Sequence, residues 1–253
     1  MKILLFSLRH YLTDIREVAE FFLTLPFYLW TIGGMKYPGG KGLQYRRIIN
    51  LMPPHEVYIE THLGGGAVMR HKRPARRNIG IEIDPEVIGK WSEMKGIEVE
   101  LIHGDGIDYL RGYKFTGKEL VYCDPPYLRH TRKKYYPLYT YEYSAEKHRE
   151  LLEVIKSLPC MVMISGYESS LYMEHLKSWR SHTYQATTHN GMAVEWLWMN
   201  YPPPLELHDY RYLGDNSKER ERIKLKTARW VSGLKKMPTL ERNALLSAIN
   251  ENF

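Results

Sequence analysis

The chain has 253 residues, of which 43% are hydrophobic and 26% are charged, a balance typical of a soluble globular protein. An excess of 36 Lys and Arg over 29 Asp and Glu gives a formal charge of +7, which favours a polyanionic partner such as nucleic acid, although charge alone fits an unrelated basic enzyme equally well. The two cysteines, Cys123 and Cys160, lie in apolar runs and the histidines show no metal-ligand spacing. We therefore expect no disulfide, no metal site and a reduced, cytoplasmic protein.

The first 34 residues differ from the rest of the chain. Residues 21–32 are strongly apolar, but they are too few to span a bilayer comfortably and Pro26 interrupts them. No small-residue cleavage site follows a compact apolar core, so we expect neither a secretory signal nor a membrane partner. We interpret residues 1–34 as an N-terminal extension, or as sequence upstream of a true start at Met35.

From Tyr37 onward, short apolar runs alternate with amphipathic stretches, which is typical of a parallel α/β sheet. The runs that predict strands are residues 57–60, 78–82, 98–102, 120–123, 161–165 and 194–200. One helix is predicted to begin near Pro85, and another covers residues 146–158, where apolar side chains recur at helical spacing. Three prolines at residues 202–204 follow the last run, so we place the sheet domain at residues 35–204.

Residues 205–253 have a different pattern. Residues 218–236 predict a basic helix with its apolar side chains on one face, and Pro238 ends this helix. Residues 240–249 predict a second amphipathic helix. We interpret the tail as a helical hairpin that packs against the sheet domain.

A glycine-rich turn, Glu60-Thr61-His62-Leu63-Gly64-Gly65-Gly66, separates the first predicted strand from a helix. Glycines let the backbone approach a ligand closely, although such turns are often only structural. Glu82 ends the second strand, where a carboxylate can accept hydrogen bonds from both ribose hydroxyls, and Asp105 ends the third, where it can accept one from an adenine amino group. Either acid would also serve as a helix cap. Together the three features indicate a crevice for an adenosine-containing ligand.

The strongest motif is Asp124-Pro125-Pro126-Tyr127, at the end of the fourth predicted strand. An aromatic amine is a poor nucleophile because its lone pair is delocalised into the ring. A carboxylate and a backbone carbonyl, each accepting one N–H, localise that lone pair so that it can attack a sulfonium methyl group. Pro126 helps to hold the Pro125 carbonyl in place, and Tyr127 offers a flat face to a base flipped out of a duplex. The structural alternative is a proline turn capped by the aspartate.

These motifs resemble those of the Dam-type DNA adenine methylases, particularly the compact phage and prophage members. The resemblance runs from about Lys36 to Pro204, and its motif order is specific to this group. Tyr37-Pro38-Gly39-Gly40-Lys41 looks like the family motif whose lysine contacts the methionine carboxylate of the cofactor, and Glu195–Tyr201 is similar to a late strand of the compact members. The resemblance implies the catalytic residues Asp124, Pro125, Pro126 and Tyr127. It implies the cofactor-binding residues Tyr37, Lys41, Glu60, His62, Gly64, Gly66, Glu82 and Asp105.

The fold that this resemblance implies is the Rossmann-like, seven-stranded, mostly parallel sheet of class I methyltransferases dependent on S-adenosylmethionine. The implied activity is methylation of the exocyclic amino group of adenine in DNA, in a restriction-modification or protective role. Two departures stand out. The family usually has Pro-Phe where this chain has Thr61-His62, so we expect a more polar cofactor wall. Larger members insert a helical recognition domain where this chain has little more than one helix between Glu82 and Asp105.

Sequence selectivity must then come from elsewhere, and residues 128–143, directly after the catalytic tyrosine, are the leading candidate. Basic side chains there can hold phosphates while interleaved tyrosines stack on bases. The DNA-binding residues that we predict are Arg129, Arg132, Lys133, Lys134 and Tyr135. Residues 218–236 fit a solvated charged face as well as a phosphate contact. Because both segments have more charge and tyrosine than Asn and Gln, we expect a short or degenerate target.

Three other functions stay open on the sequence. The proline-containing motif also serves enzymes that methylate an amino group of RNA or a glutamine side chain of a protein. A DNA-binding module with a vestigial methyltransferase site is a further alternative, and the intact set of Lys41, Glu82, Asp105 and Asp124 argues against it.

Overall fold

The computed structural model describes residues 41–42, 44–132, 140–188 and 191–252. The chain divides into two compact units, one formed by Met35–Leu213 and the other by Met1–Gly34 together with Gly214–Phe253. The predicted residues Tyr37, Lys133, Lys134 and Tyr135 lie outside the described residues, as do residues 1–34.

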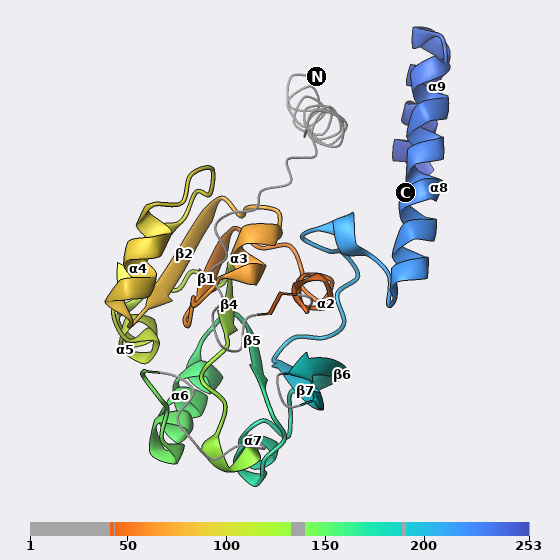
Figure 1. Ribbon diagram of the computed structural model, residues 1–253. Helices are drawn as coiled ribbons and strands as arrows, with labels where there is room; N and C mark the ends of the chain where they lie inside the picture. The colour runs from red at the N-terminus through yellow and green to blue at the C-terminus, as the bar shows by residue number, and fades with distance from the viewer. Residues whose placement is uncertain (1–40, 43, 133–139, 189–190, 253) are drawn as a thin grey trace. The chain divides into compact units, whose positions relative to one another are not determined.

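A single sheet dominates the first unit (Figure 1). Its strands are β1 (Val57–Glu60), β2 (Arg77–Glu82), β3 (Glu100–His103), β4 (Glu119–Cys123), β5 (Met161–Gly166), β6 (Arg180–Thr188) and β7 (Gly191–Met199). Within the described residues the sheet has seven strands in the order β3-β2-β1-β4-β5-β7-β6, and β7 runs in the opposite direction to the other six. The expected seven-stranded, mostly parallel sheet is confirmed.

One strand of this sheet, β6, was not among the runs that predicted strands. Its sequence, RSHTYQATT, is polar and lacks the apolar run by which the other strands are recognised. Alternate residues nevertheless face the core, because Tyr184 and Ala186 are buried while Thr183 and Gln185 are exposed. Pairing with β7 along its whole length stabilises it as an edge strand.

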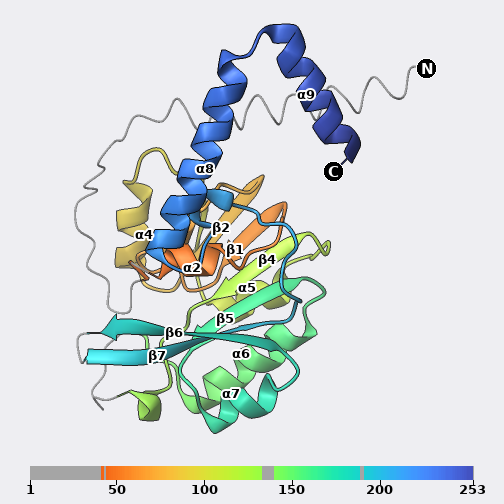
Figure 2. The same ribbon diagram turned by 90° about the vertical axis from the view of Figure 1, so that its right-hand side faces the viewer.

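Helices cover both faces of the sheet, and successive side chains along each strand point to opposite faces. One core joins α2 (Tyr45–Ile49), α3 (Ala67–His71) and α4 (Pro85–Ser92) to strand residues such as Tyr122. The opposite core joins α5 (Gly106–Gly112), α6 (Ala145–Ser157) and α7 (Ser170–His175) to residues such as Cys123. Figure 2 shows the strands edge to edge between these layers. Cys123 and Cys160 are both free, and both lie in the second core or against it.

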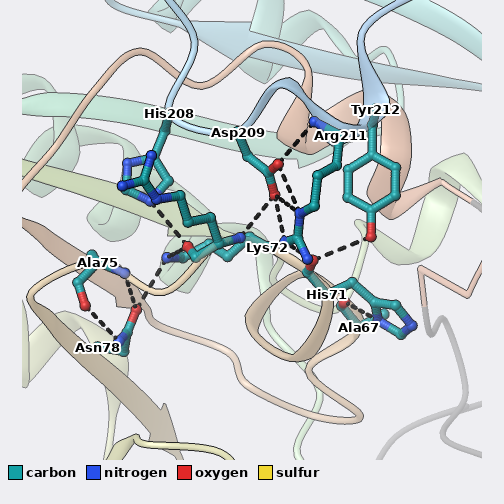
Figure 3. Close-up of polar contacts among 10 residues, drawn as sticks. Ala67, His71, Lys72, Ala75, Asn78, His208, Asp209, Arg211 and Tyr212 are labelled. Atoms are coloured by element: carbon teal, nitrogen blue, oxygen red, sulfur yellow. Dashed lines mark hydrogen bonds and ion pairs between the residues drawn. The ribbon is translucent and has the colours of Figure 1, made fainter. Parts of the chain in front are cut away.

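The sheet unit continues beyond Pro204, where we expected it to end, through the short helix η2 (Tyr210–Tyr212) to Leu213. Asp209 is 2% exposed and accepts a hydrogen bond from the backbone N–H of Arg73. The guanidinium of Arg211 donates to both oxygens of the Asp209 carboxylate and to the carbonyl of His71. Figure 3 shows this network, which ties the segment after Pro204 to the connection between α3 and β2.

The second unit contains the two helices predicted in the tail, α8 (Ser217–Lys236) and α9 (Thr239–Asn252). The side chain of Asn216 caps α8 by accepting from the backbone N–H of Glu219. No side chain of either helix is buried, and Trp230 is 65% exposed. The two helices meet at a bend around Met237 and diverge from it (Figure 2). The expected packing of this tail on the sheet domain stays a prediction.

Candidate active site

The strand order reverses between β1 and β4, because β2 and β3 follow on one side and β5 on the other. Ligands of open α/β sheets bind at the carboxyl ends of the strands at such a switch point. A pocket lies there, and it gathers predicted residues from four strand ends. The predicted residues that line it are Lys41, Glu60, His62, Gly64, Gly66, Glu82, Asp105, Asp124, Pro125 and Pro126.

The glycine turn forms one side of this pocket, and Glu82 anchors it. One Glu82 oxygen accepts the backbone N–H of Gly64 at 2.8 Å, and the other accepts that of Asp84 at 3.0 Å. Gly66 has a left-handed φ of 53°, and a Cβ at this position would lie 2.1 Å from the ring of Trp91. The turn therefore requires glycine at this position for both backbone and packing reasons.

Asp105 begins α5 as its N-cap, as a lone acid at a strand end was expected to do. Its Oδ1 accepts the backbone N–H groups of Ile107 at 2.7 Å and Asp108 at 3.3 Å. The other oxygen, Oδ2, lies 3.4 Å from the ammonium of Lys147. Capping therefore uses one oxygen and fixes the carboxylate at the pocket wall, where Oδ2 can also accept from a ligand.

Glu60 lies at the end of β1 and is 3% exposed. Its Oε2 accepts a hydrogen bond from the Tyr58 hydroxyl at 3.0 Å. Burial raises the pKa of Glu60 to about 8, and the nearby Asp124 carboxylate adds to the shift. At neutral pH this pocket residue is therefore mainly a neutral carboxylic acid, which can donate as well as accept a hydrogen bond.

Part of the pocket wall comes from a segment that the sequence pattern assigned to DNA contacts. Thr140, Tyr141 and Tyr143 line the pocket. The Tyr143 hydroxyl lies 2.9 Å from Nε2 of His62, and the two rings meet edge to face. Burial lowers the pKa of His62 to about 3, so the ring is neutral. The wall is therefore aromatic and uncharged, and the polar atoms of Thr61-His62 are largely paired with protein groups. Only the tertiary contact with His62 identifies Tyr143 as a pocket residue.

Asp124 follows β4 directly, and one of its two oxygens is held by protein groups. Oδ1 accepts a hydrogen bond from the Ser165 hydroxyl at 2.7 Å and lies 3.0 Å from the ammonium of Lys41. Among the described residues, no hydrogen bond or ion pair is found for Oδ2. Burial raises the pKa of Asp124, and Lys41 and Ser165 oppose this shift. The arrangement leaves one carboxylate oxygen to accept an N–H from a substrate.

Lys41, assigned by resemblance to the methionine carboxylate of a cofactor, lies against the catalytic motif. Its side chain is 6% exposed, and its ammonium donates to the Tyr127 hydroxyl at 2.7 Å. The carboxylates of Asp124 and Glu195 raise its pKa well above the usual value against the effect of burial. It also lines the pocket, so a ligand carboxylate would meet an ammonium that is already engaged.

Tyr127 is half-buried and lies outside the residues that line the pocket. Its ring packs edge to face on Tyr167, with ring centroids 4.6 Å apart. Its hydroxyl accepts from Lys41 and donates to Glu195 at 3.1 Å. Both hydrogen-bonding functions of the hydroxyl are thus used, which fixes the ring beside Asp124.

The two arginines in the described part of the predicted DNA-binding loop differ in exposure and in their partners. Arg129 is exposed in the short helix η1 (Arg129–Thr131). Arg132 forms two hydrogen bonds of 2.7 Å with the carboxylate of Glu142, and its side chain is 6% exposed. This bidentate pair closes the two ends of the segment on each other. Arg132 therefore has a structural partner here, whereas Arg129 presents its charge to solvent.

No cluster of metal-ligating side chains occurs among the residues that the structure describes. Within the same ranges, no helix has the length and apolar content to cross a bilayer.

Residues 107–190 match the family model of the D12 class N6 adenine-specific DNA methyltransferases. This segment includes Asp124–Tyr127 and covers about a third of the chain, and the match supports a methyltransferase activity. A narrower kinship with phage members stays a prediction. A comparison with curated proteins finds no match.

Several solved structures are similar to this chain over more than half of its length. One is TrmK of M. capricolum in complex with S-adenosyl-homocysteine, at 8% identity and a TM-score of 0.44, with 82% of this chain and 94% of that chain covered. SMU.1697c of Streptococcus mutans, in complex with SAH, has 14% identity and a TM-score of 0.45, with 62% and 94% covered. An rRNA methylase of Streptococcus thermophilus has 14% identity and a TM-score of 0.43, with 62% and 93% covered.

Proposed function

We propose that this methyltransferase transfers the methyl group of S-adenosylmethionine to the exocyclic amino group of adenine in DNA. The observation that carries the proposal is the position of Asp124 at the mouth of the switch-point pocket, with Oδ1 held by Lys41 and Ser165. A carboxylate fixed in this way has one oxygen for an amino group and cannot rotate without breaking an ion pair.

The pocket suits the adenosine-containing cofactor in the chemistry of its donors. Residues 64–66 line the pocket without side chains and would hold the methionine chain, and the Glu82 carboxylate, already oriented by two N–H groups, can accept from ribose hydroxyls. Oδ2 of Asp105 can accept an adenine amino N–H, and the neutral His62 and Tyr143 rings provide a flat wall. When bound, S-adenosylmethionine supplies the electrophilic methyl group with a neutral thioether as leaving group.

For transfer, this chain's residues position and polarise the amine. Oδ2 of Asp124 accepts one N–H, and the Pro125 carbonyl, followed by a proline that fixes the backbone, accepts the other. Tyr127 stacks on the base. S-Adenosylmethionine would supply the methyl group to the amino nitrogen, and the proton released from this nitrogen would pass to the Asp124 carboxylate and then to solvent.

DNA is preferred over RNA or a protein glutamine as the substrate for two reasons. The matched family acts on adenine in DNA, and the +7 charge, with exposed Arg129 beside the catalytic motif, suits a phosphate backbone. The vestigial-module alternative conflicts with a pocket in which Asp124, Lys41 and Glu82 are all held by specific partners. We also propose a reduced, cytoplasmic setting, which suits the two free cysteines.

Substrate competition tests the proposal. The full chain is incubated with labelled S-adenosylmethionine and, in one mixture, unmethylated plasmid, structured RNA and a glutamine-rich protein. We expect N6-methyladenine in the plasmid alone by mass spectrometry of the digested nucleosides, and mapping of the modified bases would reveal the target. Label in RNA or protein would assign the site to that substrate, and cofactor binding without any transfer would support the vestigial module.

A further inference from the structure

Glu195 is a buried acid on β7 that the reaction described above does not use. In the register of the sheet, Trp196 pairs with Gly166, the last residue of β5, so Glu195 lies one position beyond the carboxyl end of that strand. On the other side it pairs with Tyr184 of β6. At this position the Glu195 carboxylate extends beyond strand β5 and lies close to the Asp124–Tyr127 motif at the end of β4.

One oxygen of Glu195 interacts with several side chains close to Asp124. Oε2 accepts the Tyr184 hydroxyl at 2.9 Å and the Tyr127 hydroxyl at 3.1 Å. The ammonium of Lys41 lies 3.6 Å from the same oxygen. Glu195 is thus linked through Tyr127 to the ring that stacks on the base, and through Lys41 to Oδ1 of Asp124.

The charges in this cluster explain why an acid, rather than a neutral side chain, suits this position. Two carboxylates, those of Asp124 and Glu195, share the single buried ammonium of Lys41. If Glu195 were neutral, the Lys41 ammonium would pair with Asp124 alone. This stronger pairing would weaken the Asp124 carboxylate as an acceptor for a substrate N–H. With Glu195 charged, the ammonium is held between them and Asp124 keeps more of its negative charge.

We propose that Glu195, oriented by Tyr184, is a positioning residue for methyl transfer that sets the placement of Tyr127 and Lys41 and, through them, the strength of Asp124 as an acceptor. The inference rests on the proposed function, because it assigns Asp124 and Tyr127 to the substrate. It predicts that the loss of Glu195 lowers the rate of transfer more than it lowers cofactor affinity.

Two variants and one matched control test the proposal. Glu195→Gln keeps the shape and the acceptor oxygen but removes the charge, and Tyr184→Phe removes one hydrogen bond to Glu195. Tyr201→Phe, whose buried hydroxyl donates to the Leu51 carbonyl, is the control for loss of a buried hydroxyl outside the cluster. For Glu195→Gln we expect kcat on DNA to fall roughly tenfold to a hundredfold, with cofactor affinity by calorimetry within about twofold of the wild type. For Tyr184→Phe we expect a loss of roughly threefold to tenfold.

A readout without substrate separates this inference from the proposed function. The negative charge of Glu195 adds to the effect of burial in raising the pKa of Asp124. Glu195→Gln should therefore lower that pKa in the free protein, measured from the carboxylate ¹³C shift of labelled Asp124, and the acid limb of kcat should move to lower pH. The inference would be overturned if Tyr184→Phe had the same kcat as Tyr201→Phe. It would also be overturned if Glu195→Gln folded and left the pKa of Asp124 unchanged. A wild-type protein that methylates no substrate would overturn the proposed function, while the ¹³C titration still decides whether the charge of Glu195 acts on Asp124.

Discussion

The ammonium of Lys41 lies 3.0 Å from Oδ1 of Asp124, and among the described residues no hydrogen bond or ion pair is found for Oδ2. The sequence motif around Lys41 is assigned by resemblance to the cofactor. In the fold, the same lysine stabilises the charge of Asp124, so one side chain connects the switch-point pocket to the proposed site of methyl transfer.

Lys41→Met should move the acid limb of kcat to higher pH. Transfer requires Asp124 in its ionised form, and the positive charge of Lys41 lowers the pKa of Asp124 against the effect of burial. Removing that charge raises the pKa, so the aspartate is protonated at a higher pH. The pH profile of kcat with saturating cofactor measures the shift, with exposed Lys118→Met as control. A limb that stays in place, or that moves to lower pH, would contradict the role of Lys41.

Asp124→Ala should abolish methyl transfer and leave cofactor affinity largely intact. The carboxylate is assigned to the amine, and loss of a positioned acid–base group typically costs roughly 10² to 10⁴ in rate. Label incorporation measures transfer and calorimetry measures affinity. Substantial turnover, or complete loss of cofactor binding in a folded variant, would reject the assignment.

Glu82→Ala should weaken cofactor binding by roughly 10-fold to 100-fold, because buried partners are left unpaired. The change removes the acceptor for the ribose and also the hydrogen bonds that hold the N–H groups of Gly64 and Asp84. Glu82→Gln retains the shape and one acceptor oxygen, so we expect an intermediate loss. Calorimetric affinities of both variants, with unfolding temperatures as a check on the fold, test this. An affinity for Glu82→Ala equal to that of the wild type would remove Glu82 from the cofactor site.

Gly66→Ala should destabilise the protein, by about 1–3 kcal/mol or more, because the added Cβ meets Trp91 and the backbone is left-handed. Gly89→Ala is the matched control. Gly89 lies inside α4 with no atom within 4 Å of an added Cβ, so the change should stabilise by about 0.4–1 kcal/mol. Urea unfolding of both variants gives the two free energies. Equal effects at the two glycines would show that the turn is not fixed as described.

Arg129→Ala should affect DNA binding alone, whereas Arg132→Ala should also affect the stability of the protein. Loss of exposed Arg129 should weaken DNA binding alike on all sequences and flatten the slope of log K against log salt by about 0.9 for each phosphate that is no longer neutralised. Loss of Arg132 leaves the partly buried Glu142 carboxylate without its bidentate partner, so we expect lower stability of the protein as well. Binding titrations at several salt concentrations, together with thermal unfolding, distinguish the two. An Arg129→Ala variant with altered discrimination between sequences would mean that this residue reads bases.

Much of the site follows from the sequence because its signals are local. Apolar runs marked six of the seven strands, and residues that end a run, such as Glu82, Asp105 and Asp124, must meet at one edge of a parallel sheet. The glycine at residue 66 and the caps at Asp84 and Asp105 also depend on backbone within a few residues.

The tertiary structure alone decided which distant side chains meet. Strand β6 forms because β7 supplies its hydrogen bonds, since its own polar sequence has no apolar run. Arg132 pairs with Glu142, which brings these two residues of the expected DNA loop together. Tyr143 contacts His62, so this residue forms part of the pocket wall. The cluster of Lys41, Asp124 and Glu195 joins three parts of the chain far apart in sequence. No periodicity encodes such a cluster, because its geometry depends on how the strands pair and on the burial that makes each charge require a partner.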